Sequence, residues 1–275
     1  MKWNNLDSFN LSKKADNYLY DIIKLLENYL KDRLISIVLF GSAIKGYSAD
    51  ESDVDILIIV SDDCNKKEIN YLHQLIISFE IKYNFVVPLN GLISRILYCI
   101  DRSTGMFISH FITRKTDFLK GNFARTFQVN KFISNVLAPN KIVYGSVLCR
   151  AKILYGQNLI KEAKIPNIPI RQLFKSILMN IITSIFTLFI YPLTKRATLY
   201  EMETAKWSFL AAYYYIKHDS PPLPTLLKFF LDRNISTKYV KKWVALRNNY
   251  KQDLKFGLFT PLNILKIHMA ILKYT

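Results

Sequence analysis

The strongest constraint on the fold is a stretch in which glycines and two aspartates separate two short apolar runs. The first run, 34–40, is rich in β-branched residues and short for a helix, so it predicts a buried strand. The second run, 56–60, predicts a neighbouring strand that begins just after Asp53 and Asp55. Because side chains two residues apart on a strand point to the same face, the two carboxylates should lie close together.

Two carboxylates held together indicate a bound cation, because without one they repel each other. Mg²⁺ is the expected ion, with Mn²⁺ as its substitute, since it prefers oxygen ligands and leaves positions open for phosphate oxygens. Gly41 and Ser42 follow the first run, and a glycine there lets the backbone turn tightly and approach a ligand. A plainer alternative is an ordinary strand with an acidic end and a glycine turn before it.

In order and spacing, this stretch resembles the nucleotidyltransferases of the DNA polymerase β type, through Gly41, Ser42, Gly46, Ser52, Asp53 and Asp55. The resemblance implies that the glycines and serines bind the triphosphate of a nucleoside triphosphate such as ATP. It also implies that the two aspartates are catalytic and hold the metal. The expected reaction moves a nucleoside monophosphate to an acceptor hydroxyl and releases pyrophosphate.

One feature departs from the family that this stretch resembles. Such proteins carry a third carboxylate on the following strand, which is expected here at 83–89 and contains no acidic residue. Glu80 and Asp101 lie near it in sequence but off the expected strand. The order and spacing of the motif around Asp53 and Asp55 still favour a nucleotidyltransferase. The alternative is a degenerate member that binds nucleotide or nucleic acid without turnover.

The pattern changes after a proline-containing segment, 165–170, which is the expected linker. We expect an α/β (α+β) nucleotidyltransferase domain with a short mixed sheet at 1–165, followed by an all-α domain at 166–275. Helices are predicted at 15–33 and after a capping box formed by Asn65 and Glu68. The last helix is predicted at 261–273, with Thr260 as its N-cap.

The helical domain contains candidates for a general base and for a contact to the phosphates. Kanamycin-type nucleotidyltransferases, which this layout resembles, use a glutamate and a lysine about one turn apart as general base and phosphate contact. Glu203 and Lys206 have this spacing on the predicted helix 198–217, and Glu201 is the alternative base. An ordinary surface ion pair explains the same spacing.

The uncharged segment 176–193 reaches the lower length limit of a membrane span. A stripe of polar side chains runs along one side of it at helical spacing: Ser176, Asn180, Thr183, Ser184 and Thr187. This stripe favours a buried helix that touches a cleft or a partner, so membrane insertion is not expected.

The charge balance, a formal net charge of +17, favours acidic partners, although general solubility explains it as well. It tilts the expected acceptor slightly toward RNA, with a protein or a small hydroxyl compound as alternatives. Arg114 is a candidate phosphate contact, or else part of a solvated charged face. The cysteines are scattered and odd in number, which favours a reducing, cytoplasmic location.

Overall fold

The computed structural model describes residues 11–41, 54–85, 108–163 and 167–274. These residues form two compact units. The first contains residues up to 134 together with 150–166, and the second contains 135–149 and 167–275. Segment 135–149, which we expected in the first domain, thus belongs to the second compact unit, whereas the expected boundary at 165–166 stays a prediction.

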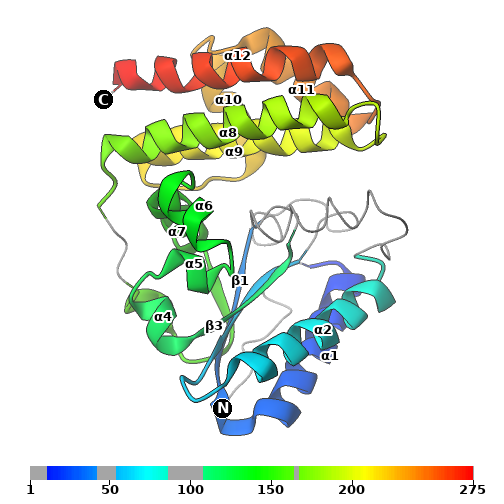
Figure 1. Ribbon diagram of the computed structural model, residues 1–275, viewed down its shortest axis with the longest axis vertical. Coiled ribbons are helices and arrows are strands. Elements are labelled where there is room, and N and C mark those ends of the chain that lie inside the picture. Colours follow the sequence, from blue (N-terminus) through cyan, green and yellow to red (C-terminus); the bar gives the residue numbers. More distant parts are fainter. Residues whose placement is uncertain (1–10, 42–53, 86–107, 164–166, 275) are drawn as a thin grey trace. The chain divides into compact units, whose positions relative to one another are not determined.

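The first unit is built on a small mixed sheet in the order β3-β2-β1-β4 (Figure 1). The central strands are β1 (Leu34–Phe40) and β2 (Asp55–Val60), which pair antiparallel. The outer strands are β3 (His110–Arg114), parallel to β2, and β4 (Lys152–Gly156), antiparallel to β1. Both apolar runs therefore form the buried strands that the sequence predicts.

The helices α1 (Lys13–Leu30) and α2 (Lys66–Lys82) lie side by side and share a hydrophobic core with the strands (Figure 1). A stripe of apolar residues on α1, including Leu19, Ile22 and Leu26, is fully buried in this core. The capping box at the start of α2 is confirmed: the Asn65 side chain accepts from the Glu68 amide, and the Glu68 carboxylate accepts from the Asn65 amide.

Shorter elements complete this unit. They are η2 (Lys31–Arg33), α4 (Lys115–Leu119), α5 (Phe123–Thr126), α6 (Lys131–Val136, which continues into the second unit) and η4 (Leu159–Lys161).

The predicted strand at 83–89 does not begin at Tyr83, because Tyr83 caps α2 and residues 84 and 85 follow in a turn. Positions 86–89 lie outside the described residues, and the strand beside β2 is β3.

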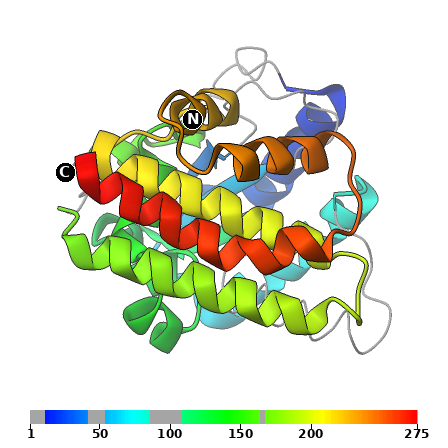
Figure 2. The same ribbon diagram turned by 90° about the horizontal axis from the view of Figure 1, so that it is seen from above.

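The second unit is helical: α7 (Asn140–Leu148), α8 (Ile170–Ile190), α9 (Ala197–Lys217), α10 (Leu223–Asp232), α11 (Thr237–Asn248), α12 (Leu254–Ile271) and η5 (Leu272–Tyr274). One side of α9 packs on α10, α11 and α12 around Phe209, Phe230 and Trp243. Its other side meets α8 and α12, which run beside it (Figure 2). The predicted α/β part followed by a helical part is confirmed.

The start of the last helix differs from the prediction. α12 begins at Leu254, and the carboxylate of Asp253 accepts from the Phe256 amide as its N-cap. Thr260 is inside the helix, where its hydroxyl donates to the Phe256 carbonyl, and Pro261 follows inside the helix as well. Proline is typical of a first turn, so the sequence pattern placed the start of the helix about two turns too late.

Helix α8 contains the polar stripe that the sequence predicts, and the stripe is buried. Ser184 donates to the Glu201 carboxylate of α9, and Ser176 is 3.1 Å from Nε2 of His268 on α12. Asn180 in turn donates to Ser176. Among the described residues, α8 is the helix long and apolar enough to cross a membrane by length and composition, with a mean hydropathy of 1.9. Its polar side is satisfied within the helical unit.

Candidate active site

The candidate site is at the end of the sheet where β1 finishes and β2 begins. Phe40, the last residue of β1, pairs with Asp55, the first residue of β2. The chain leaves β1 through Gly41, whose φ of +76° is strained for residues with a side chain. A Cβ at this position would lie 1.9 Å from Oδ2 of Asp55. Glycine is therefore required for the carboxylate to lie directly against the backbone that follows β1.

The rest of the predicted motif continues from these two residues. Ser42, Gly46, Ser52 and Asp53 lie outside the described residues, so their roles stay predictions. Asp53 precedes the half-buried Asp55 by two positions. The described part of the motif thus provides one carboxylate, that of Asp55. It lies against the Gly41 backbone at the end of the sheet where β1 finishes and β2 begins.

The donors at this end of the sheet have the chemistry that Mg²⁺ prefers. Asp55 supplies carboxylate oxygens that lie directly against the Gly41 backbone. The described ranges contain no group of three or more histidine, cysteine and acidic side chains arranged to hold a metal. A divalent ion would accordingly depend on Asp55, on the neighbouring Asp53 and on oxygens of the nucleotide.

A buried polar network flanks Asp55 on the α2 side of the sheet. The amide of Ile56 donates to the carbonyl of Ser109, which directly precedes β3. The hydroxyl of Ser109 and Nδ1 of His110 both bond to Oε1 of Glu80, at 2.5 and 2.7 Å. Glu80 and His110 are buried. The carboxylate of α2 thereby ties the first residues of β3 to the helix layer, one strand away from Asp55.

His73 extends this network, with its Nδ1 2.8 Å from Nε2 of His110. Neither the position of Glu80 off the expected strand nor the spacing of the histidines predicted this network. A usable signal was present, because His73 and Glu80 are seven residues apart and so share one face of a helix. The partner His110 is distant in sequence, and only the parallel pairing of β3 with β2 brings it there.

Arg114 lies at the other end of the strands. In the β2–β3 register it pairs with Val60, whereas Ile56 pairs with His110. At about 3.3 Å per residue, Arg114 is roughly 16 Å along the sheet from the level of Asp55. Its Nε donates to the carbonyl of Cys64, 2.9 Å away. This position does not fit the predicted phosphate contact and instead fits a structural role at the start of α2.

Glu203 and Lys206 form the ion pair that their spacing on α9 predicts. Both side chains are partly exposed. Their shared helix face and partial exposure are compatible with a surface ion pair. They are equally compatible with a general base beside a phosphate contact. Their catalytic roles stay predictions.

Glu201, the alternative base, is fully buried within the helical unit. Ser184 donates to its Oε2, and burial raises the pKa of the carboxyl to about 8. The side chain is consequently protonated at neutral pH and sealed between helices α8, α9 and α12. A general base must reach the proton that it removes, so this placement argues against Glu201 in that role.

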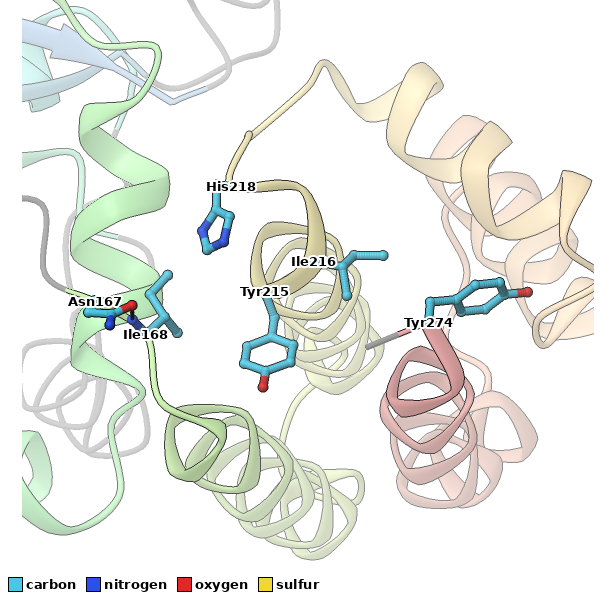
Figure 3. Close-up of a pocket in the computed structure, with 6 residues that line it drawn as sticks. All are labelled: Asn167, Ile168, Tyr215, Ile216, His218 and Tyr274. Atoms are coloured by element: carbon cyan, nitrogen blue, oxygen red, sulfur yellow. Dashed lines mark hydrogen bonds between the residues drawn. The ribbon is translucent and has the colours of Figure 1, made fainter.

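A pocket of about 300 Å³ in the helical unit contains none of the predicted residues. It is lined by residues that precede α8, end α9 and end the chain: Asn167, Ile168, Tyr215, Ile216, His218 and Tyr274 (Figure 3). This lining has no carboxylate, so it lacks the ligands of a divalent cation site.

The comparisons with known proteins agree with this geometry. Residues 21–100 match the family described as polymerase beta, nucleotidyltransferase, and this region contains β1, β2 and both aspartates. A relative from Methanocaldococcus jannaschii, named "Putative protein adenylyltransferase", is 36% identical over 64 residues. That match covers 23% of this chain and 65% of the relative, which is just under two thirds of its length.

A solved structure resembles nearly the whole chain in fold. It is described as spectinomycin adenyltransferase from Enterococcus faecialis with ATP and spectinomycin. The likeness has a TM-score of 0.56 at 12% identity and covers 92% of this chain and 98% of that chain.

By its family match, the region 21–100 of the first unit is therefore of the polymerase β nucleotidyltransferase type, which the name of the relative also indicates. The fold likeness extends into the helical unit, so the order of a small mixed sheet followed by helices is common to both proteins. The two names mention a protein and a small-molecule antibiotic, and neither mentions RNA. The slight tilt toward RNA that charge suggested finds no support in these comparisons.

Proposed function

We propose that this protein is an adenylyltransferase, which moves AMP from ATP to a hydroxyl group of a protein or a small molecule. The observation that carries the proposal is the Asp55 carboxylate packed on the backbone of Gly41, within the region that matches the family. The names of the two similar proteins support ATP as the nucleotide. A cytoplasmic location, where ATP is available, is part of the proposal.

In this proposal, one group of residues binds the triphosphate and another binds the metal ion. Gly41 and Ser42, with Gly46 and Ser52, would hold the triphosphate through backbone amides and hydroxyls. Asp53 and Asp55 would hold Mg²⁺ or Mn²⁺, which when bound neutralises phosphate charge and lowers the pKa of the acceptor hydroxyl. In such a reaction the acceptor oxygen attacks the α-phosphorus, the bond to the bridging oxygen breaks, and pyrophosphate leaves. Positioning and electrostatics supply most of the acceleration.

The reaction also needs a base that takes the acceptor proton. No acidic residue occurs at 83–89, and Glu201 is sealed within the helical unit. Glu203 remains the candidate, with Lys206 as the contact to the triphosphate.

The alternative is a binding module that holds nucleotide without turnover, which the missing strand carboxylate favours. The two functions differ in one product. Incubation with α-labelled ATP, Mg²⁺ or Mn²⁺, and either total cell protein or a small-molecule extract should label an acceptor and release pyrophosphate. Nucleotide binding without pyrophosphate release in any of these mixtures would support the binding module.

A further inference from the structure

The helical unit has an exposed apolar face that its own fold does not cover. Helices α8 and α12 lie side by side (Figure 2). On α8 the exposed large side chains include Phe174, Leu178, Ile182, Ile185 and Phe189. On α12 they include Leu258, Leu262, Leu265 and Met269. Exposed apolar side chains that recur at helical spacing on two neighbouring helices favour an interaction site, whereas ordinary surfaces carry single scattered ones.

The exposed side of α8 is apolar, whereas a helix that faces water exposes mainly polar residues there. Its polar residues Ser176, Asn180 and Ser184 point inward, where they bond to one another or to α9 and α12. Leu173, Ile177 and Ile190 are buried with them, whereas other large apolar residues of α8, including Phe174 and Phe189, are exposed. A helix in water normally turns its apolar stripe to the core, whereas an apolar solvent selects the opposite arrangement. The pattern therefore indicates lipid as the medium for this face.

Charge selects the kind of lipid. Neither α8 nor α12 contains an acidic residue. Exposed cations occur on both helices and after α8: Arg171, Lys195, Arg196, Lys255 and Lys266. A basic amphipathic surface of this composition is attracted to anionic headgroups. Two copies of the chain meeting through this face would instead bring the same cations together, which opposes a dimer.

We propose that the face formed by α8 and α12 binds peripherally to the surface of a membrane rich in anionic phospholipid. The apolar side chains enter the headgroup and upper acyl region, and the basic side chains contact the phosphates. α8 does not cross the membrane in this arrangement, because its polar side stays bonded within the helical unit. The proposal is independent of the transferase activity.

The test uses the full chain and extruded vesicles of phosphatidylcholine with or without about 40% phosphatidylglycerol, in a flotation assay. Phe189→Glu and Leu262→Glu should each weaken binding to anionic vesicles by about tenfold or more, because a charge is costly at the apolar level of the interface. Phe132→Glu is the matched control: Phe132 is 69% exposed, against 72% for Phe189, and lies on α6 outside this face. It should bind like the wild type.

A conservative substitution guards against misfolding of the charged variants. Phe189→Trp should be quenched by brominated phosphatidylglycerol vesicles, whereas Phe132→Trp should not. Absence of wild-type binding to anionic vesicles overturns the proposal, and so does unchanged binding of a folded Phe189→Glu variant. A stable dimer in light scattering that Phe189→Glu converts to a monomer also overturns it, in favour of a second copy as the occupant.

Discussion

The carboxylate of Asp55 lies against the backbone of Gly41, so closely that a Cβ on Gly41 would be 1.9 Å from its Oδ2. This contact joins the end of one central strand to the start of the next. It also explains why the motif needs glycine at this position: both the left-handed φ and the contact exclude a side chain.

Gly41→Ala should therefore displace Asp55 and reduce nucleotidyl transfer by about a hundredfold, since small displacements in a positioned site cost this much. Gly121→Ala is the matched control, because Gly121 also has a positive φ, of +64°, but lies between α4 and α5. Both variants should lose about 1 kcal/mol of stability through backbone strain. Equal transfer rates in the two variants would contradict the role of the contact.

The network around Glu80 predicts a structural cost. Glu80→Gln leaves Ser109 and His110 with a neutral partner in place of the buried carboxylate. Loss of charge-assisted bonds in a buried site should lower the free energy of unfolding by about 1–3 kcal/mol, measured by denaturant titration. Glu27→Gln, which changes a carboxylate bonded to Tyr155 near the surface, should cost less. A neutral Glu80→Gln would mean that the network does not stabilise the start of β3.

Glu201 predicts a dependence of stability on pH. Burial raises the pKa of its carboxyl from 4.5 to about 8 in the folded state. Between these values the unfolded chain has released a proton that the folded chain retains, so the free energy of unfolding falls as pH rises from 4.5 to about 8. Glu201→Gln cannot ionise, so across this window its free energy of unfolding should rise relative to that of the wild type by about 5 kcal/mol.

The readout is the difference in thermal midpoint between wild type and Glu201→Gln at several pH values. Burial also lowers the pKa of His268 to about 4, which adds an opposite dependence between about 4 and 6.5. That effect is common to both proteins and cancels in the difference. Parallel curves from acid to alkaline pH would show that Glu201 ionises freely in the folded state.

Local sequence signals predicted the elements that local chemistry determines. The apolar runs gave β1 and β2, and the Asn65–Glu68 pair gave the start of α2, because capping and alternation act over a few residues. The same reasoning failed for the last helix. It placed the helix start at Thr260 and Pro261, whereas α12 begins at Leu254 with Asp253 as its N-cap.

Features that depend on long-range pairing were not predictable in this way. The strand beside β2 comes from residues 110–114, and only the register reveals that Arg114 is far from Asp55 while His110 is near its level. Likewise, the polar stripe on α8 was visible in sequence, but its bond to Glu201 requires the packing of α8 on α9.

The helical unit provides a separate prediction about catalysis. Lys206→Ala should raise the apparent KM for ATP, and Glu203→Gln should lower kcat by about a hundredfold with little change in KM. Lys242→Ala, which breaks the Lys242–Asp253 ion pair of the same unit, is the control and should leave both constants unchanged. Wild-type kinetics for Glu203→Gln and Lys206→Ala would assign them to an ordinary surface ion pair.

The central claim is that Asp53 and Asp55 support transfer of AMP from ATP. The most direct measurement compares acceptor labelling from α-labelled and γ-labelled ATP in the wild type, Asp53→Asn and Asp55→Asn. Label should come from the α-phosphate alone, and both variants should lose labelling. Their thermal stability should be unchanged or raised, because carboxylate repulsion is relieved. Full labelling by either variant, or ATP binding by the wild type with no transfer and no pyrophosphate release, would contradict it.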